Sequence, residues 1–422
     1  MKLLVFAHTP PPHHGQSYMV ELMLNHFGGD QRHATVASVP PHGIQCYHVN
    51  ARFSRSLEDV GEFQGVKILL ILWYCLTAIW CRFRHGVTNF YYVPAPGKRV
   101  AVYRDWLVLF LCRPFFKRLV LHWHAAGLAK WLETSVQMRT RALTYHWFKN
   151  ADLSIVISNY NMADAEKLRS QTIRVVNNGI PDPCANYSAS VLPRRKARLA
   201  VRQHLIAQTP PHQEDLAWAG GNPHIVQVLY IAHCSREKGL FAAAQGVRLA
   251  NATLAGRNSP LRLKLLAAGS FVAKAEQEEF DDLLKTPEFS GALQHLGFVS
   301  GVEKDQVLRE ADIFCFPTLY MGENQPVNLI EAMAYGLPIL TTRWRSLPEM
   351  FPPRYAGFVD DQAPDKVAEV LLQLMDGDNG QELRDNFIHT FTLEYHLKNL
   401  AAALHEIERP MSAALSPNRA IA

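Results

Sequence analysis

Two carboxylates about three quarters of the way along the chain have a spacing that raises the question of a ligand site. The stretch reads ENQPVNLIEAMAYGLP, and Glu323 and Glu331 stand eight positions apart in it. The residues around Glu331 are mostly apolar, and a buried carboxylate is costly unless a partner pairs with it. Either Glu331 is solvated at the one exposed edge of a helix, or something binds it.

The neighbouring residues predict where that helix begins and ends. Asn324 can cap its N-terminus, and Pro326 suits its first position because proline has no N–H to satisfy there. Gly336 supplies a left-handed turn and Pro338 cannot continue a helix, so together they predict its end. We expect a helix over about residues 326–335.

Three other positions with possible chemistry follow expected strands. HTPPPHHGQS follows the first strand, and its Gly15 opens a helix where backbone N–H groups can approach an anion. HWHAAG places His124 at the end of a buried strand, either as a ligand contact or as a satisfied core residue. AHCSREKGL places Lys238 at a turn into a helix, where it can neutralise a phosphate or remain solvated.

Length and charge narrow the class of protein. At 422 residues, of which 48% are hydrophobic and 19% charged, the chain is globular and long enough for two domains. Residues 1–190 hold 20 lysines and arginines against 11 acids, whereas residues 191–422 hold 23 against 27. A basic first half favours anionic partners such as phosphates or lipid headgroups. Since no nucleic-acid-reading motif accompanies it, nucleic acid is not expected as a partner.

The cysteines and the N-terminus suggest a compartment. The seven cysteines are scattered and never form a C-x-x-C pair, which favours reduced thiols in the cytosol over a disulfide framework or a zinc site. The N-terminal MKLLVFAHTPPP has too few apolar residues for a signal peptide and is expected to form a first buried strand.

One apolar run has two interpretations. ILLILWYCLTAIWC, Ile68–Cys81, is shorter than the roughly 20 residues that span a bilayer. It is either a core helix or a helix lying in the membrane interface, with tryptophans and flanking cations at headgroup level. A second such patch, Trp106–Val120, includes Arg113, Lys117 and Arg118 in the same basic half.

Short apolar runs alternate with helical patterns along most of the chain, which is typical of parallel βαβ units. The alternation lapses at residues 188–223, a polar stretch rich in proline and glycine that we interpret as the domain boundary, with a short helix around Arg195–Leu205. The C-terminal stretches Pro364–Met375 and Asn379–Ile407 are expected to be helical. The expected strands are Lys2–Ala7, Thr35–Val39, Asn89–Val93, Arg118–His122, Leu153–Ile157, Ile173–Val176, Ile225–Ile231, Leu261–Ala268, Leu293–Phe298, Asp312–Phe316 and Pro338–Thr342.

In order and spacing these features resemble the retaining glycosyltransferases of family 4. The resemblance is strongest in GFVSGVEKDQVLREADIFCFPTLYMGENQPVNLIEAMAYGLPIL, residues 297–340, where E-x7-E runs into E-A-M-A-x-G-x-P. It extends to S-N-Y (158–160), NNGIPD (177–182), EKG (237–239) and LPE (347–349).

The resemblance implies an α/β fold of the GT-B type, in which two Rossmann-like, doubly wound domains face a cleft. The N-terminal, acceptor domain would comprise residues 1–183 plus about 395–410, because the C-terminal helix crosses back to it. The C-terminal, donor domain would comprise residues 184–394, followed by a frayed tail at 411–422.

The resemblance also implies roles for single residues. Glu331 would accept hydrogen bonds from the ribose hydroxyls of a nucleotide, and Glu323 would contact hydroxyls of the donor sugar. Lys238 would bind the diphosphate, with Gly15 pressed against it. His124 would reach the donor sugar near the bond being broken. Backbone N–H groups at the start of the acidic helix would face the sugar and diphosphate, around Asn324, Gln325, Pro326 and Val327.

Two departures from the family pattern fall in this donor site. The family usually has Gly-Arg six and five residues before the lysine, where Ala232 and His233 stand here. A titratable ring at His233 therefore replaces a fixed positive charge on the diphosphate. In addition, the usual E-G after the first acid is Glu323–Asn324.

The implied reaction moves a sugar from a nucleotide diphosphate sugar to a hydroxyl acceptor with retention of the anomeric configuration. The basic, apolar first half would hold a saccharide or lipid-linked saccharide acceptor at the cytoplasmic face of the inner membrane, for exopolysaccharide, capsule or lipopolysaccharide assembly. No D-x-D motif is seen where a metal would be expected, so neither a metal nor another cofactor is expected.

Three alternatives stay open at this point. A sugar-nucleotide epimerase or phosphorylase could use the same fold, and a non-catalytic partner subunit would accommodate His233 and Asn324. A nicotinamide-dependent oxidoreductase would need G-x-G-x-x-G after a strand, and prolines stand there instead.

Overall fold

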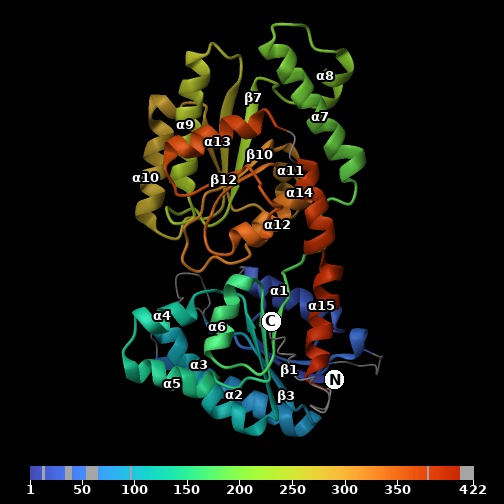
Figure 1. The fold of residues 1–422 in the computed structure, drawn as a ribbon, viewed down its shortest axis with the longest axis vertical. Coiled ribbons are helices and arrows are strands. Elements are labelled where there is room, and N and C mark those ends of the chain that lie inside the picture. Colours follow the sequence, from blue (N-terminus) through green and yellow to red (C-terminus); the bar gives the residue numbers. More distant parts are fainter. Residues whose placement is uncertain (12–14, 34–39, 54–64, 96, 378–379, 409–422) are drawn as a thin grey trace, which may run out of the picture. The chain divides into compact units, whose positions relative to one another are not determined.

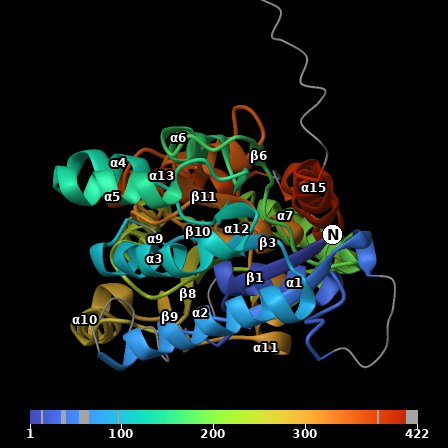
Figure 2. The ribbon, with the colours of Figure 1, turned by 90° about the horizontal axis from the view of Figure 1, so that it is seen from below.

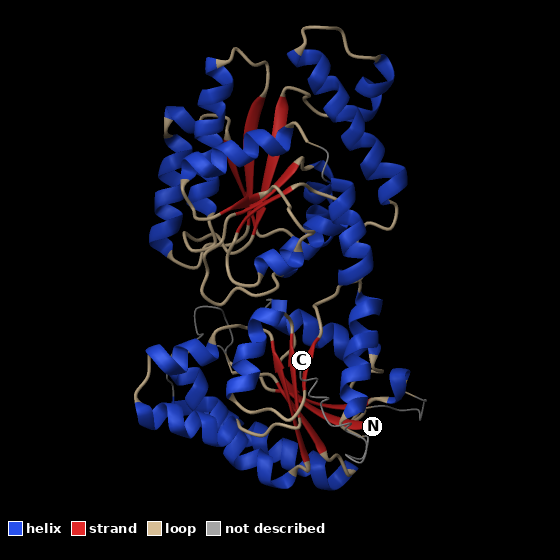
Figure 3. Ribbon diagram, viewed as in Figure 1, coloured by secondary structure: helices blue, strands red, loops and turns tan. Residues whose placement is uncertain are grey.

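The computed structural model describes residues 1–11, 15–33, 40–53, 65–95, 97–377 and 380–408. The chain divides into two compact units, in each of which helices flank a parallel sheet (Figures 1 and 3). The first unit comprises Met1–Ile157, Asn161–Val176 and the chain from His396 onward; the second comprises Ser158–Tyr160 and Asn177–Tyr395. The chain therefore enters the second unit briefly at Ser158–Tyr160, passes to it again after Val176 and returns at His396.

Six parallel strands form the sheet of the first unit, in the order β2-β1-β3-β4-β5-β6. Their buried positions are apolar; along β1, for example, Leu3, Leu4 and Val5 are completely buried. The strands are β1 (Lys2–Ala7), β2 (Gln45–Asn50), β3 (Asn89–Tyr92), β4 (Arg118–Trp123), β5 (Leu153–Val156) and β6 (Ile173–Val175).

Helices of the first unit pack against this sheet and one another. The core includes residues of the sheet together with the inner sides of α2 and α3. The helices are α1 (Gly15–His26), α2 (Gly65–His85), α3 (Arg99–Cys112), α4 (Leu128–Thr134), α5 (Met138–Phe148), α6 (Met162–Lys167) and most of α15 (Leu393–Glu406), with short 3-10 turns η1 (Pro41–Gly43) and η2 (Arg113–Phe115). A third 3-10 turn, η3 (Asn159–Asn161), lies mainly in the second unit.

The sheet of the second unit has the order β12-β11-β10-β7-β8-β9. This is the doubly wound order in which the chain reverses direction between two neighbouring central strands, here β7 and β10, and ligands bind beyond the carboxyl ends of such strands. The strands are β7 (Ile225–Ile231), β8 (Arg262–Ala268), β9 (Leu293–Gly297), β10 (Ile313–Phe316), β11 (Ile339–Thr342) and β12 (Phe358–Val359).

The helices of the second unit include the acidic helix predicted from the sequence. They are α7 (Tyr187–Ile206), α8 (Gln213–Ala219), α9 (Leu240–Gly256), α10 (Lys274–Lys285), α11 (Gly301–Glu310), α12 (Val327–Ala334), α13 (Pro364–Met375) and α14 (Gly380–Asn386), with short turns η4 (Pro287–Phe289), η5 (Leu347–Met350) and the π-helical η6 (Phe387–Phe391). All seven cysteines of the chain are buried free thiols.

Most of the expected strands are present within a residue or two of their expected bounds. The expected strand Thr35–Val39 lies outside the described residues. Two strands were not expected from the sequence. The first, β2, reads QCYHVN and lacks the apolar run that marks its neighbours, and β12 has only two residues.

Residues 188–223 hold more regular structure than expected: the short helix expected around Arg195–Leu205 is part of α7, and α8 follows it. The helix α7 runs through Pro193, and its arginines turn inward to anchor it on the sheet. Arg202 Nη2 lies 2.7 Å from Asp312 Oδ2, and Arg198 Nε donates to the carbonyl of Ala219 at 2.8 Å. Buried ion pairs of this kind give a polar-looking sequence a packed helical structure.

The beginning of the acidic helix also differs from its prediction. Pro326 is the N-cap of α12, and the helix proper covers Val327–Ala334. Asn324 does not cap it; its side-chain oxygen accepts a hydrogen bond from the hydroxyl of Ser158 at 2.7 Å. The predicted end is confirmed, since Gly336 has φ +58° and its N–H donates to the carbonyl of Met333.

Candidate donor site

The carboxyl ends of β7 and β10 bring two of the predicted site residues into contact. Lys238 follows β7 and Glu323 follows β10, and these strands are neighbours at the point where the strand order reverses. Lys238 Nζ lies 2.5 Å from Glu323 Oε2 although the residues are 85 positions apart. The pair can form because the carboxyl ends of neighbouring parallel strands lie at the same edge of the sheet.

Aromatic rings enclose the lysine on its other sides. Lys238 Nζ lies 4.3 Å from the ring centroid of Tyr320 and 5.6 Å from that of Phe316. A ring face attracts a cation, and this attraction is stronger where water is excluded. Burial, with the charge of Glu323, raises the pKa of the Tyr320 hydroxyl, so this ring stays neutral. The ammonium group is therefore held in place before any ligand arrives.

A glycine sets the position of Lys238 in the chain. Gly239, directly after it, is the N-cap of α9 with φ +89°. A Cβ at this position would lie 2.4 Å from the carbonyl oxygen of Pro317, at the end of β10. Only glycine allows the turn to come this close to the neighbouring strand. The glycine of the EKG motif thus allows the turn after β7 to pack closely against the end of β10. These two strand ends carry the site.

Thr318 also holds the carboxylate of Glu323. Its hydroxyl donates to Glu323 Oε2 at 3.3 Å, and Thr318 itself is completely buried. The side chain of Glu323 is 8% exposed. A carboxylate so far from water needs both partners, because an unpaired buried charge is costly.

The ring of His233 lies half-buried near this ion pair. Burial, followed by the positive charge of Lys238, lowers the pKa of His233, while Glu323 opposes the shift. The imidazole is therefore neutral at pH 7 in the ligand-free protein. Its backbone carbonyl is fixed by a hydrogen bond from the Tyr230 hydroxyl at 2.8 Å.

The N-terminus of α12 lies at the end of β7. Asn328, in its first turn, donates from its side chain to the carbonyl of Ile231 at 2.7 Å, which ties the helix to this strand. Val327 begins the helix, and Pro326 carries no N–H that could face a ligand. Helix N-termini attract anions through their free N–H groups and the helix dipole. The helix thus brings donors to the strand end that precedes Lys238.

The side chain of Gln325 has a structural role. Its Oε1 accepts from the N–H of Asn178 at 2.9 Å, and its Nε2 donates to Asn177 Oδ1 at 2.9 Å. The NNGIPD motif therefore supports the loop in front of α12. Further along the same motif, Asp182 binds Arg384 through both carboxylate oxygens at 2.8 and 2.6 Å.

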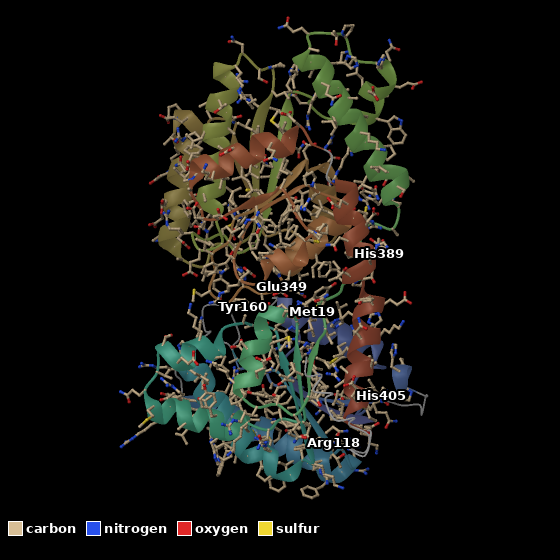
Figure 4. All side chains as sticks on the ribbon, in the orientation of Figure 1. Met19, Arg118, Tyr160, Glu349, His389 and His405 are labelled. Carbon is tan, nitrogen blue, oxygen red and sulfur yellow. The ribbon has the colours of Figure 1, made fainter. Side chains whose placement is uncertain are left out.

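The S-N-Y and L-P-E motifs also bind each other. Figure 4 labels Tyr160 and Glu349, whose carboxylate accepts hydrogen bonds from the N–H groups of Asn159 and Tyr160 at 2.7 and 2.9 Å. Together with the Ser158–Asn324 hydrogen bond, this contact fixes Ser158–Tyr160 on the second unit. Asn324, the departure from the family's glycine, is therefore explained by a packing contact.

Glu331 has a partner that sequence reasoning missed. Lys304 Nζ, on α11, lies 2.6 Å from Glu331 Oε1, and the carboxylate is only partly exposed. Both residues line a cavity of about 510 Å³, within the size range of ligand pockets. The other lining residues are Pro183, Gly301, Val302, Asp305, Leu308, Arg309 and Tyr335. The mid-helix acid is neither buried alone nor simply solvated.

Two predicted site residues belong to the first unit. Gly15 is exposed at the first position of α1, and the loop before it, residues 12–14, lies outside the described residues. His124 follows β4 directly, and its ring centroid lies 4.2 Å from that of His122. His122 is fully buried against the Tyr91 hydroxyl, and burial with the neighbouring histidines holds its pKa well below 6.5.

The residues that sequence reasoning missed have side chains that act on residues it found. Lys304 pairs with Glu331, Thr318 with Glu323, and Tyr320 with Lys238. Thr318 and Tyr320 stand in the stretch PTLY, directly after β10, so their place at the end of an expected strand could have indicated a site. Lys304 does not stand at the end of a strand, and nothing in the sequence near it marks it. Over the described part of the chain, no three His, Cys, Asp or Glu side chains are grouped as metal ligands.

Comparison with known proteins agrees with this geometry. The family model named Glycosyl transferases group 1 matches residues 222–391. This range contains every predicted site residue of the second unit.

Two curated relatives extend the likeness. The chain is 28% identical over 165 residues to the amylovoran biosynthesis glycosyltransferase AmsK of Erwinia amylovora, which covers 36% of this chain and 37% of AmsK. It is 23% identical over 306 residues to the O-antigen chain mannosyltransferase B of Escherichia coli, covering 71% of this chain and 66% of that protein. The match thus spans little more than a third of AmsK and just under two thirds of the mannosyltransferase.

Solved structures share the fold over nearly the whole chain. Anabaena HepE, solved in complex with UDP and glucose, superposes with a TM-score of 0.60 at 14% identity, covering 95% of this chain and 98% of HepE. Sucrose-phosphate synthase of Thermosynechococcus elongatus gives 0.62 at 15% identity, covering 97% and 99%. Residues 222–391 therefore form a domain of the glycosyl transferases group 1 family, within a chain that has the two-sheet GT-B fold.

Proposed function

We propose that this protein transfers a sugar from a nucleotide diphosphate sugar to a hydroxyl acceptor during the assembly of a bacterial surface polysaccharide. The observation that carries the proposal is the Lys238–Glu323 pair at the ends of β7 and β10, beside the N-terminus of α12. A fixed cation and helix N–H groups suit a leaving diphosphate, and the carboxylate suits the hydroxyls of a sugar. The names of the relatives support polysaccharide assembly as the setting.

In the proposed reaction, breaking the anomeric bond builds negative charge on the diphosphate. Lys238 and the first turn of α12 face that charge, and donors held in place beforehand lower the barrier because they need no rearrangement. Glu323 orients the donor sugar through its hydroxyls. Glu331 would exchange Lys304 for the ribose hydroxyls of the nucleotide, at the rim of the 510 Å³ cavity.

Retention of the anomeric configuration is part of the proposal. Retention commonly uses a carboxylate nucleophile, but Glu323 is held by Lys238 and Thr318. We infer front-face substitution in which the leaving diphosphate accepts the acceptor's proton. Gly15 and His124 keep the roles that the resemblance implies. The reaction is proposed to need no metal ion, since no D-x-D motif stands in the sequence where a metal would be expected.

The proposed acceptor is a saccharide or a lipid-linked saccharide at the cytoplasmic face of the inner membrane. The excess of basic residues in the first 190 residues supports an anionic, diphosphate-bearing acceptor. The lipid-linked form fits the apolar helix α2 of the same unit.

A panel of nucleotide sugars tests the proposal. The purified protein is titrated with UDP- and GDP-sugars by saturation-transfer NMR and thermal shift, with EDTA present in a parallel series. We expect one donor to bind, to be hydrolysed slowly without acceptor, and to release the sugar first as its retained anomer in either series. Binding without any hydrolysis or transfer would favour a non-catalytic partner subunit, and formation of an epimer would favour an epimerase.

A further inference from the structure

The outward side of α2 carries an apolar stripe. Its members recur at intervals of four and three residues, which places them on one side of the helix. Each has between 55% and 68% of its surface exposed: Leu69, Trp73, Leu76, Trp80 and Phe83. A helix on the outside of a protein normally presents polar side chains there. Figure 2 shows α2 along its whole length at the outer side of the first unit.

The stripe continues onto neighbouring elements. Phe83 meets Phe115 of η2 with ring centroids 6.0 Å apart, and Phe110 of α3 meets Trp147 of α5 at 5.3 Å. Large exposed apolar side chains on these elements also include Tyr103, Met138 and Leu143. We call the exposed apolar residues of α2, α3, η2 and α5 the α2–α5 face. Exposed apolar side chains gathered on neighbouring elements in this way mark interaction sites when they form a patch.

The stretch that carries α2, α3 and η2 is strongly basic. Residues 65–118 contain nine lysines and arginines and a single acid, Asp105. Asp105 is completely buried, where it accepts hydrogen bonds from Arg104 and from the Tyr92 hydroxyl, each at 2.7 Å. The exposed cations of these elements therefore have no acid beside them within the same stretch; they include Arg84, Lys98, Arg99 and Lys117. An apolar face with a cationic border complements an anionic lipid surface.

The packing of α2 distinguishes lying on a membrane from crossing it. Its stretch Ile68–His85 is long and apolar enough to cross a bilayer, with a mean hydropathy of 1.2. However, the inner side of the helix is part of the core of the first unit, where Cys75, Ala78 and Cys81 are at most 1% exposed. Crossing would strip the helix from the sheet. A helix in the interface keeps the core and buries only its outer side.

We propose that the α2–α5 face docks the protein on the surface of an anionic lipid bilayer, with α2 lying in the plane of the interface. The alternative occupant is a second copy of the chain. A symmetric dimer would set the same patch against itself, so its cations would face one another with no exposed acid from the described residues 65–118 to pair with. An anionic bilayer satisfies both the apolar stripe and its border. This inference is independent of the proposed sugar transfer.

Vesicle binding by the full-length protein tests the inference. We expect sedimentation with vesicles of phosphatidylglycerol and phosphatidylcholine, at least tenfold weaker binding to phosphatidylcholine alone, and weaker binding at high salt. Brominated lipids should quench the wild-type tryptophan fluorescence because Trp73 and Trp80 lie on the face. The vesicles contain neither donor nor acceptor, so failure here would leave the sugar-transfer proposal standing. Absence of both sedimentation and quenching would overturn the docking surface.

Two pairs of substitutions locate the contact. Leu69→Gln with Leu76→Gln should weaken binding at least tenfold with an unchanged melting temperature, since both side chains are exposed. The matched control is Leu216→Gln with Trp218→Gln, exposed apolar residues of α8 in the second unit, which should bind like wild type. Equal losses in both pairs would contradict the proposed face.

The other occupant is checked without lipid. Sedimentation velocity compares the wild type with Leu76→Gln. The wild type should show no self-association that is lost in the variant. A dimer abolished by this substitution, together with no vesicle binding, would assign the face to a second copy. Arg84→Gln with Lys117→Gln should weaken binding to the anionic vesicles while leaving any binding to phosphatidylcholine unchanged; no effect on the anionic vesicles would contradict the charge argument.

Discussion

At the scale of single residues, the candidate donor site consists of charges that already have partners. Lys238 is paired with Glu323 and Glu331 with Lys304 in the ligand-free protein. Under the proposed function, a nucleotide sugar would replace these pairings as it binds. The substitutions below separate the contribution of each group to binding from its contribution to turnover.

Glu331→Ala should weaken binding of the nucleotide diphosphate by about 1.5–3 kcal/mol, the range for hydrogen bonds to a charged group. Isothermal titration with UDP and GDP measures it. Lys304→Ala serves as the control, because the lysine should be displaced by the ribose; its removal should leave affinity unchanged or raise it. Unchanged affinity in Glu331→Ala would refute the ribose assignment.

Glu323→Gln keeps the size of the side chain and removes its charge. Turnover should fall by about 10²-fold, the loss seen when one preorganised group is removed. Affinity for the bare nucleotide diphosphate should stay or rise, since Lys238 is then free to bind phosphate. Glu237→Gln, an exposed acid directly before Lys238, should change neither quantity. A parallel loss of diphosphate affinity and turnover in Glu323→Gln would contradict this division of roles.

His233 predicts a pH dependence of donor binding. In the free protein, burial and Lys238 lower its pKa below the ordinary 6.5. A bound diphosphate favours the charged ring and raises that pKa. Binding then takes up a proton, and affinity falls as pH rises from the free-state pKa through the bound-state pKa.

The variant His233→Arg carries a permanent charge and should flatten this dependence, while binding at least as tightly at about pH 8. Isothermal titration of the nucleotide diphosphate between about pH 6 and 8.5 compares the two proteins. If affinity changes with pH in the same way in both proteins, the ring of His233 supplies no positive charge to the diphosphate. Of these two side chains, only Lys238 would then do so.

At the scale of elements, two strand ends and one turn place the site. Gly239→Ala should destabilise the second unit by about 2–4 kcal/mol, because the left-handed backbone is strained for alanine and its Cβ would lie 2.4 Å from the carbonyl of Pro317. The control is Gly256→Ala at the other end of α9, where nothing lies within 4 Å of the added Cβ. It should stabilise by about 0.5–1 kcal/mol. Thermal melts of both variants measure these effects. If Gly239→Ala and Gly256→Ala melted at the same temperature, the turn at Gly239 would not be constrained.

At the scale of the whole molecule, the chain divides into two compact units, and apart from Ser158–Tyr160 it passes to the second unit once and returns once. The second unit is nearly continuous in sequence, so a fragment of residues 177–395 should fold and melt cooperatively. It contains Lys238, Glu323 and Glu331, and should bind the nucleotide diphosphate within about tenfold of the full chain. The fragment lacks Ser158–Tyr160, which Glu349 and Asn324 bind, so some loss of stability is expected.

The complementary fragment of residues 1–176 provides the comparison. It lacks α15, whose Leu400 and Leu404 are completely buried. It should therefore fold less stably than the second unit alone. A fragment 177–395 with no cooperative melt would show that the units depend on each other.

The sequence by itself determined the class of fold and most of its strands. Buried parallel strands appear in a sequence as short runs of apolar residues, so each strand can be recognised from its own residues. It also determined α12 and its end, because Gly336 and Pro338 act through local backbone geometry. The motifs of residues 297–340, with the shorter motifs before and after them, carried the family resemblance.

Only the tertiary structure decided which groups pair. The Lys238–Glu323 and Lys304–Glu331 contacts join residues 85 and 27 positions apart, and no local pattern reports which side chains two strand ends or two helices bring together. The tertiary structure was also needed for α7. Its arginines make the sequence look like a polar domain boundary, and only the structure shows that they turn inward to pair with Asp312. It was needed for α2, too: an apolar sequence does not tell which side of a helix packs on the sheet, and packing leaves the stripe from Leu69 to Phe83 exposed.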